Sequence, residues 1–451
     1  MNSLRPEASA AASVKVFDTW WPLALSWLLM GIELPVLSAV VSRQANPEIM
    51  LAAFGGVIFP IALLVESPVI MMLAASTAVS RDLSSFRRLQ RFNVLITAVL
   101  TGVHALIALT PLFDLVIVPL LDVPPELRDP SMTGLAIMIP WTWAIGDRRF
   151  CQGALIRIGH REKIAQGSIL RLFATISAGL IVAWAGGSGV VIATTGLSVG
   201  VIVEAMFARF FAQRLVVPSL RQSGPAASPP PRNLAAFYLP LALTPMLILA
   251  SQPLAAAGIS RMPEALACLA VWGPAGGLVF LVRSSGIAFN EVVIARCEVA
   301  GAIGQLRRFA WAWGTGWTLL LLAVAVTPLV DVWFGPMIGL SPELVEIGRS
   351  ALWLAIPIPL LTFLQSYWQG LLVHAHRTRA VTESVAIFLG VMAVGMAAGM
   401  AIGHWNGLIV AMAAFMAGNA AQTLWLRRKW LRPGPVRPEQ PAQAGSAPEP
   451  I

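Results

Sequence analysis

Long apolar runs take up most of this chain and recur at nearly regular intervals, with short charged stretches between them. A helix needs about 20 apolar residues to cross a bilayer, and most of these runs reach that length. We predict twelve membrane spans, which makes the chain an all-α polytopic membrane protein. The spans cover residues 17–41, 50–80, 92–121, 131–156, 164–185, 189–210, 234–258, 264–295, 309–330, 345–373, 380–403 and 405–426.

The composition supports this prediction. Of the 451 residues, 57% are hydrophobic and 12% are charged, whereas soluble domains are about 45–50% apolar and about 25% charged. The spans leave only short connectors, and no HExxH, GxSxG, P-loop or GxGxxG motif stands in a suitable context. The three cysteines show no paired spacing. We therefore expect neither an enzyme nor a resident cofactor or metal ion.

The two halves of the chain resemble each other. Six short matches recur in the same order at shifts of 216 to 218 residues, which indicates a duplicated unit of six helices. Because each unit has an even number of spans, the halves share one orientation, and their symmetry axis runs along the membrane normal. The matches are PLALS at 22–26 with PLALT at 240–244, Pro35 with Pro253, Ser42-Arg43 with Ser260-Arg261, Pro47-Glu48 with Pro263-Glu264, LQRF at 89–92 with LRRF at 306–309, and Gln152-Gly153 with Gln369-Gly370.

We divide the chain accordingly into two pseudo-symmetric six-helix bundles around a central cleft. The N-terminal bundle covers 1–217 and the C-terminal bundle covers 234–432. Between them, 218–233 is rich in Pro, Ser and charged residues, which suits an extended cytoplasmic linker. The tail at 433–451 has a similar composition and is expected to be disordered.

Basic residues are distributed unevenly between the two sides of the predicted membrane. Of the 31 lysines and arginines, four lie well inside spans and four in loops or at a span end on one side, which leaves 23 on the side of the termini. Cytoplasmic loops are enriched in Lys and Arg, so we place both termini in the cytoplasm and the chain in the inner membrane. The formal charge of +9 is then an orientation signal. We expect a monomer whose partners are the bilayer and a small-molecule substrate, with no nucleic acid.

A few charged residues remain within the spans, where each costs roughly 2.5–3.5 kcal/mol at the helix centre and marks a functional site by default. Glu33, Glu66, Asp147 and Arg283 lie near the middle of their spans. At a shift of 217, Glu66 falls on Arg283, so opposite charges are expected to face each other across the symmetry axis. They either form a static ion pair that holds the halves together or line a transport path.

Glu33 lies two residues before Pro35 in the first span. A proline inside a helix removes a backbone donor and frees a carbonyl group. A carboxylate one turn away suits a site for H+ or Na+, so Glu33 is our candidate for ion coupling. The alternative is a buried acid that a neighbouring helix satisfies.

Asp147, Arg148 and Arg149 are consecutive, and their repeat counterparts include Gln365 at the position of Arg148. An arginine fork suits a phosphate or carboxylate ligand, but local pairing with Asp147 is an equal alternative. Asn290 lies nearer the inner mouth and is a candidate gate. The predicted substrate path therefore consists of Glu66, Arg283, Asp147, Arg148, Asn290 and Gln365.

Two further charged residues, Arg171 and Glu204, lie within about two turns of a predicted cytoplasmic helix end. Long charged side chains at this depth can extend along the helix to reach the interface. We expect both to do so, without a role in the path.

Several sequence patches in spans 1, 2 and 4 and in the connector after span 4 resemble the progressive ankylosis protein family. They are WWPLAL at 20–25, MLAAFG at 50–55 with Ser67-Pro68 further on, SRD at 80–82, and QGALIRIGHRE at 152–162 with its second-half counterpart QGLLVHAHRT. That family belongs to the multidrug/oligosaccharidyl-lipid/polysaccharide exporter superfamily. The resemblance implies two six-helix bundles around a central cleft and alternating access to a midplane site. For the close relatives, it implies export of anions such as pyrophosphate, nucleotides or citrate.

Our main hypothesis is a secondary active exporter of a small organic or phosphate-bearing solute, with an anion as one candidate. An ion gradient is the expected energy source because no nucleotide-binding motif is present. One alternative is a flippase for a lipid-linked or amphipathic substrate, or a cation/drug antiporter of the same superfamily. Another is a non-transporting structural membrane protein whose midplane charges hold the halves together.

Overall fold

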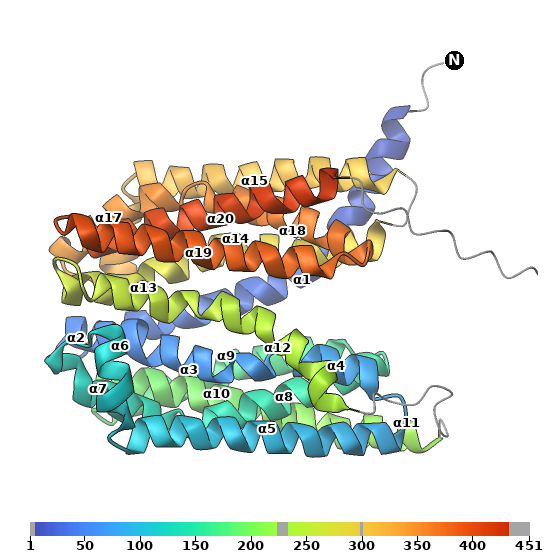
Figure 1. Cartoon of the computed structure of the whole chain (residues 1–451), viewed down its shortest axis with the longest axis horizontal. Coiled ribbons are helices and arrows are strands. Elements are labelled where there is room, and N and C mark those ends of the chain that lie inside the picture. Colours follow the sequence, from blue (N-terminus) through green and yellow to red (C-terminus); the bar gives the residue numbers. More distant parts are fainter. Residues whose placement is uncertain (1–4, 223–232, 298–300, 433–451) are drawn as a thin grey trace, which may run out of the picture.

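The computed structural model describes residues 5–222, 233–297 and 301–432, and helices make up nearly all of them (Figure 1). No β-strand occurs in these ranges, which confirms the predicted all-α fold. The first half contains α1 (Arg5–Val41), α2 (Pro47–Ala52), η1 (Ala53–Ile58), α3 (Phe59–Glu66), η2 (Ser67–Val69), α4 (Met72–Val79), α5 (Leu83–Leu109), η3 (Phe113–Ile117), α6 (Val118–Leu121), α7 (Pro125–Ile137), α8 (Ile139–Arg157), α9 (Glu162–Trp184), α10 (Gly189–Phe211), η4 (Ala212–Val216) and α11 (Val217–Gln222). The second half contains α12 (Leu234–Leu249), α13 (Ser251–Ile259), α14 (Ala265–Arg296), α15 (Ala302–Val326), α16 (Leu329–Val332), η5 (Trp333–Met337), α17 (Pro342–Ala355), α18 (Ile358–His374), α19 (Thr378–Ile402) and α20 (Gly407–Leu431).

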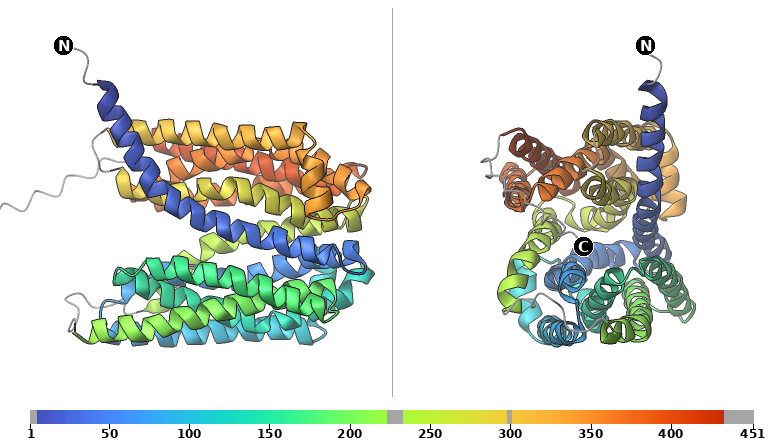
Figure 2. Two further views of the ribbon diagram at one scale, coloured as in Figure 1. Left: turned by 180° about the vertical axis from the view of Figure 1, so that it is seen from behind. Right: turned by 90° about the vertical axis from the view of Figure 1, so that its right-hand side faces the viewer.

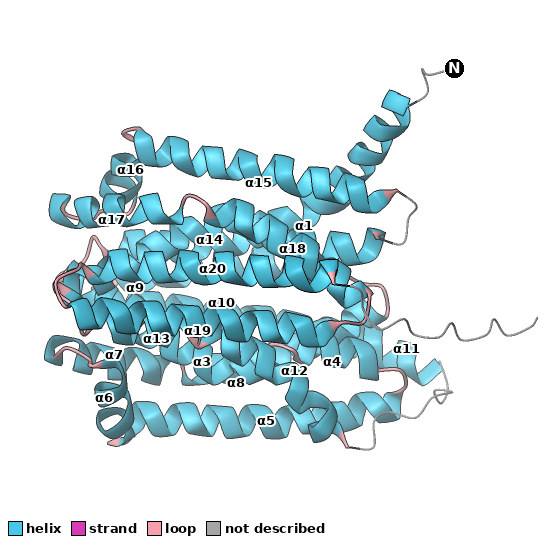
Figure 3. Ribbon diagram, turned by 45° about the horizontal axis from the view of Figure 1, so that its top comes forward, coloured by secondary structure: helices cyan, strands magenta, loops and turns pink. Residues whose placement is uncertain are grey.

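The helices form two groups that lie side by side (Figure 2). One group contains α2 to α11 and the other contains α14 to α20, while α1 and α12 run obliquely between them. Short loops join the long helices at both ends (Figure 3). The prediction of two helical bundles is thus confirmed.

Within the described residues, eleven helical segments are long and apolar enough to cross a membrane. The remaining predicted span, 131–156, corresponds to α7 and α8. Asp147, Arg148 and Arg149 reduce the hydropathy of α8, which packs against α4, α5 and α10. A charged helix can occupy this place because protein surrounds it on several sides, so its charges need not face lipid.

The third span differs from its predicted limits of 92–121, because α5 begins nine residues earlier and ends twelve residues earlier. The Ser85 backbone N–H donates to the Asp82 carboxylate at 2.8 Å, and the Asp82 N–H donates to the Ser85 hydroxyl at 3.1 Å. This capping box starts the helix ahead of its apolar part. At the other end, the residue before Pro111 is extended, which stops the helix.

The predicted linker at 218–233 is partly helical. α10 continues through η4 and α11 to Gln222, so helix covers the first five residues of that segment. Asn233 then caps α12, since its side-chain oxygen accepts a hydrogen bond from the Ala236 N–H at 3.1 Å. Residues 223–232 and the tail at 433–451 lie outside the described residues.

The internal repeat is visible in the helix packing. A Cβ atom placed on Gly153 would lie 2.2 Å from the carbonyl oxygen of Leu73. In the second half, a Cβ atom on Gly370 would lie 3.2 Å from the carbonyl oxygen of Asn290. A shift of 217 residues relates Gly153 to Gly370 and Leu73 to Asn290. The packing of α8 on α4 in the first half is therefore repeated by the packing of α18 on α14 in the second.

The first helix of each half contacts the other half as well as its own. Near the beginning of α1, Trp20 Nε1 donates to the carbonyl oxygen of Ser285 in α14 at 2.8 Å. Further along α1, Leu37 packs on α9 and α10 of the first half. In α12, the Tyr238 hydroxyl donates to the carbonyl oxygen of Pro68 in the first half at 2.5 Å. Both oblique helices therefore connect the two bundles.

We call the end of the molecule where α1 begins and α20 ends the terminal end (Figure 1). The two halves meet closely at the other end. Every residue of 51–58 and of 268–272 is buried there. A Cβ atom on Gly55 would lie 3.2 Å from Gly273 Cα, so the two backbones are nearly in contact. Toward the terminal end of α14, Glu291 is exposed. The interface is thus closed at the end away from the termini, and α14 is less completely buried toward the terminal end.

Candidate functional site

A stripe of residues, half-buried apart from the buried Glu66 in its first-half counterpart, continues the closed interface along α14 toward the terminal end. Positions three and four apart lie on one face of a helix, and this spacing occurs in both halves at a shift of 217. We infer that the two stripes line the opening between the halves. They consist of Gly276, Phe280, Arg283, Ile287 and Asn290 in the second half, and of Phe59, Leu63, Glu66, Ile70 and Leu73 in the first.

Glu66 and Arg283 occupy equivalent positions on these stripes, but no ion pair joins them in the described part of the chain. Arg283 lies instead over the ring of Phe415 in α20, with its Cζ 5.5 Å from the ring centroid. Glu66 is 5% exposed, and its Oε2 has no hydrogen-bond partner among the described residues. The static pair that the repeat suggested is therefore absent from this conformation.

Charged side chains from α1, α8, α9 and α10 form a buried network in the first half. Arg171 Nη2 lies 3.1 Å from Glu33 Oε2, and Arg171 Nε lies 3.5 Å from Glu204 Oε2. Arg148 also donates to Glu204, and the Thr175 hydroxyl donates to Glu33 Oε1 at 2.6 Å. Glu33 is thus a buried acid satisfied by a neighbouring helix. Its role in ion coupling stays a prediction.

The prediction that Arg171 and Glu204 extend toward the interface is wrong. Their side chains are 9% and 1% exposed, and they point to each other inside the bundle. Proximity to a helix end does not draw a side chain outward when an opposite charge lies on the next helix, because pairing offsets the loss of hydration. Gln152 Nε2 adds a hydrogen bond to Glu204 Oε1 at 3.0 Å.

Asp147, Arg148 and Arg149 have different environments although they are consecutive on α8. Arg209 Nε donates to Asp147 Oδ2 at 2.8 Å, so Asp147 pairs with α10 and not with its neighbours in sequence. The alternative of local pairing is therefore wrong. Arg209 carries no sequence signal for this role, because it lies at the edge of the predicted span 189–210.

Arg149 is the one member of this cluster without a hydrogen bond or ion pair in the described residues. It lies on α8, which contacts α3, the helix that ends at Glu66. Together with Glu66 and Arg283, it makes three charged groups without an ion pair among the described residues, and Arg283 has only its cation–π contact with Phe415. Two guanidinium groups and one carboxylate sum to one excess positive charge.

The remaining predicted path residues are polar. Asn290 lies on the stripe of α14, and its Oδ1 has no partner among the described residues. Gln365 is buried, and its Nε2 donates to the backbone oxygen of Asn419 in α20 at 2.9 Å. Gln365 is the repeat counterpart of Arg148, and each bonds to the last long helix of its half. Asn419 has no charge or motif that could have revealed it in the sequence.

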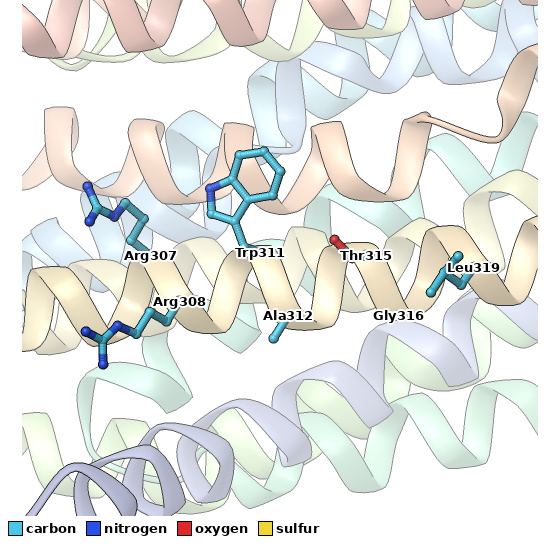
Figure 4. A pocket seen from close by; sticks show the side chains of 7 residues that line it. All are labelled: Arg307, Arg308, Trp311, Ala312, Thr315, Gly316 and Leu319. Carbon is cyan, nitrogen blue, oxygen red and sulfur yellow. The ribbon is translucent and has the colours of Figure 1, made fainter. Parts of the chain in front are cut away.

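A shallow groove lies on the outer face of α15 (Figure 4). Arg307, Arg308 and Trp311 line one part of it, and three small residues and Leu319 line the rest. These residues are exposed, whereas Leu306 and Ala310 on the other side of α15 are buried in the bundle. The groove therefore lies on the surface expected to face lipid and contains none of the predicted path residues.

No protein-family model and no curated protein matches this chain, so the resemblance to the progressive ankylosis family stays a prediction. Solved structures do match in fold. An inward-facing multidrug resistance MATE family transporter of the MOP superfamily has a TM-score of 0.64 at 14% identity, covering 90% of this chain and 94% of that chain.

Two further solved structures are as similar. The eukaryotic MATE transporter AtDTX14 has a TM-score of 0.65 at 12% identity, covering 94% of this chain and 97% of that chain. The lipid II flippase MurJ, in an inward closed conformation, has a TM-score of 0.64 at 12% identity, covering 90% and 87%. Over nearly its whole length, this chain has the fold of the MATE transporters and of MurJ.

Proposed function

We propose that this protein is a secondary active transporter that moves a small anionic solute by alternating access between its two halves. The observation that carries the proposal is the set of Glu66, Arg149 and Arg283, which have no ion pair among the described residues. An unpaired charge in a membrane span is costly. A bound solute of opposite charge would offset that cost, and the excess positive charge favours a carboxylate or phosphate.

A purely structural role fits these contacts less well. A device that holds the halves together would be expected to pair Glu66 with Arg283, whereas Arg283 lies over Phe415. The ion pairs that do form, such as Arg209 with Asp147, lie within one half. Charges between the halves are therefore available to a ligand.

The finer family assignment supports the same substrate class. The resemblance to the progressive ankylosis family implies anions such as pyrophosphate, nucleotides or citrate. A flippase for a lipid-linked substrate is the second candidate, and the likeness to MurJ favours it. Such a substrate also carries phosphate, so an assay must separate a soluble anion from a lipid-linked one.

We propose Glu33 as the site of coupling to H+ or Na+. Its contacts with Arg171 and Thr175 place a carboxylate where α1 also carries Pro35. Glu33→Gln should then abolish gradient dependence in proteoliposomes. Coupling that is unchanged in this variant would rule out the assignment.

The decisive first experiment is a binding screen on the purified full-length protein. Intrinsic tryptophan fluorescence should report binding of pyrophosphate, citrate or a nucleotide, and no binding of a cationic drug. Arg149→Gln and Arg283→Gln should each weaken the anion about tenfold or more, because a charge-assisted hydrogen bond contributes about 1.5–3 kcal/mol. Arg307→Gln, on the outer face of α15, is the matched control and should bind normally.

Transport then separates the candidates. Uptake of the bound anion into proteoliposomes, with and without a pH or Na+ gradient, supports the transporter. Movement of a fluorescent lipid phosphate across the bilayer without anion uptake supports the flippase. Tighter binding of the cationic drug than of every anion would contradict the proposed substrate class.

A further inference from the structure

Two arginines at the closed end of the molecule make the same contacts in the two halves. Arg43 follows α1, and its Nη2 donates to the carbonyl oxygens of Pro336 at 2.6 Å and Met337 at 3.2 Å. These acceptors lie in η5 of the second half. The contact therefore crosses from one half of the chain to the other.

The second arginine repeats this arrangement in the reverse direction. Arg261 follows α13, and its Nη2 donates to the carbonyl oxygens of Pro119 at 2.9 Å and Leu120 at 3.1 Å, both in α6 of the first half. Pro119 and Leu120 lie 217 residues before Pro336 and Met337. The two arginines are themselves repeat counterparts, at a shift of 218.

The Nη1 atom of each arginine contacts the arginine's own half, and Nη1 of Arg43 also donates to the carbonyl oxygen of Ile338 in the second half at 3.4 Å. Arg43 Nη1 donates to the carbonyl oxygen of Ala39, and Arg261 Nη1 donates to that of Ala257 at 2.6 Å. Each of these acceptors lies four residues earlier in the arginine's own helix. Each guanidinium is thus tied to its own helix while Nη2 binds the other half.

The acceptors are suited to a positive charge. The last four carbonyl groups of a helix have no partner within it, and the partial negative charge at a helix C-terminus attracts cations. α6 is a short helix at the closed end, next to the long helices (Figure 1). An arginine supplies five donors in a fixed plane and can bridge two consecutive carbonyls, which a lysine or glutamine does less well.

Ion pairs within each half support the acceptor segments. Arg128 Nε lies 2.7 Å from Asp114 Oδ1 beside α6. In the second half, Arg349 pairs with Asp331 beside η5. Asp114 and Asp331 are again related by a shift of 217. Both acceptor segments are thus held by their own half while an arginine of the other half binds them.

We propose that Arg43 and Arg261 form a two-part latch that holds the halves together at the end opposite the terminal end, and that both contacts break when this end opens. The helix ends that precede the arginines pack on their own halves, since Val41 packs on Gly189 and Ile259 packs on Gly407. Separation of the halves must therefore break the Nη2 contacts. The place of this step in a transport cycle rests on the proposed transport function, whereas the latch itself does not.

The distance between the halves at the closed end tests the latch without any substrate. Glu126 at the start of α7 and Glu343 at the start of α17 are exposed, lie at that end and belong to different halves. Cysteines at these two positions, in a full-length chain whose three buried native cysteines are replaced by alanine, accept spin labels. Double electron–electron resonance then measures the distribution of label distances in lipid nanodiscs.

The expected result is a single short-distance population for the parent protein. Arg43→Gln or Arg261→Gln should raise the ratio of separated to closed molecules about tenfold or more, and the double variant should raise it further. Arg377→Gln is the matched control, because Arg377 donates to a carbonyl of its own half, Arg432, at the terminal end. It should leave the distribution unchanged.

Unchanged distances in both single variants would overturn the latch, even if the double variant does not fold. An equal shift in Arg377→Gln would also overturn it, because general destabilisation would then explain the result. The readout is independent of the binding screen. A protein that binds no anion can still show the latch, and a protein without the latch can still transport.

Discussion

Arg171 and Glu33 form an almost fully buried ion pair that joins α9 to α1, with Nη2 and Oε2 3.1 Å apart. The pair lies near Pro35, which itself packs on Gly277 of α14 in the second half, and only further along does α1 pack on the first half, through Leu37. The beginning of α1 packs on the second half through Trp20. The Glu33 contact therefore anchors the oblique helix to the first half between these two regions.

Loss of one partner of this pair should destabilise the protein strongly. Glu33→Gln leaves the positive charge of Arg171 only partly compensated, and breaking a buried pair in this way costs about 3–5 kcal/mol. Thermal unfolding in detergent, followed by tryptophan fluorescence, should show a clearly lower midpoint. Glu346→Gln disrupts an exposed pair with Arg349 and should change the midpoint little. Equal midpoints for Glu33→Gln and the parent protein would contradict this prediction.

Replacing Arg283, which has no ion pair among the described residues, should raise stability instead of lowering it. Arg283→Met removes a charge without an ionic partner and keeps an apolar side chain near Phe415, so stability should rise by about 0.5–2 kcal/mol while anion binding is lost. Arg148→Met removes a partner of Glu204 and should lower stability. The two unfolding midpoints, measured together, check the prediction. A fall in both would mean that Arg283 has a stabilising partner.

The glycines of the repeated Gln-Gly pair should not be equally tolerant of alanine. At Gly153, a Cβ atom would lie 2.2 Å from the backbone oxygen of Leu73, whereas at Gly370 the nearest atom belongs to the Val293 side chain, 2.7 Å away. A side chain can move more easily than a backbone. Gly153→Ala should therefore cost more than Gly370→Ala, within the range of about 1–3 kcal/mol for overpacking.

A third glycine provides the control for these variants. Gly316 in α15 has no atom within 4 Å of a Cβ position. Alanine there removes only the poor helix propensity of glycine and should stabilise by up to about 1 kcal/mol. The unfolding midpoint should be highest for Gly316→Ala, lower for Gly370→Ala and lowest for Gly153→Ala. A reversed order of the last two would show that α8 shifts more readily than α18.

The pair of Asp114 and Arg128, beyond the end of the third span, should give a pH-dependent contribution. The Arg128 hydrogen bond holds the pKa of Asp114 below its ordinary value of 3.8. A depressed pKa stabilises the fold above the ordinary value, and this contribution is lost as pH falls through the folded pKa. The unfolding midpoint of Asp114→Asn should therefore lie below that of the parent protein at pH 7, and the gap should shrink in acid.

The control for the pH series is Glu126→Gln, an exposed position at the start of α7. It should track the parent protein across the range. A gap for Asp114→Asn that stays constant down to pH 3 would show that the carboxylate charge is not its source. The effect is expected to be small because both partners are partly exposed.

The fold was predictable because its main determinants are local or repetitive. Apolar runs of sufficient length identify most spans, and the 217-residue shift of Gln152-Gly153 to Gln369-Gly370 identifies the duplication. The limits of α5 were not predictable from hydropathy, since the Asp82 capping box starts that helix in a polar stretch. Helix caps depend on hydrogen bonds that hydropathy does not record.

The candidate site was only partly predictable. Depth in a span identified Glu66 and Arg283, and their equivalence holds, but pairing depends on which neighbours surround each side chain. Glu204 and Arg209 were hidden because a position near a helix end does not reveal the direction of a side chain. The Arg43 and Arg261 contacts were hidden because their acceptors are backbone carbonyls, which every residue provides.

The oblique course of α1 also has a consequence for the order in which the chain acquires its structure. Trp20 packs among Phe289, Phe309 and Phe363, which are translated more than 260 residues later. Until α14, α15 and α18 have been inserted, this part of the first helix lacks its native neighbours. The first helix therefore acquires its native neighbours only after α18 has been made, and shorter partial chains should depend on lipid or chaperones to cover that aromatic surface.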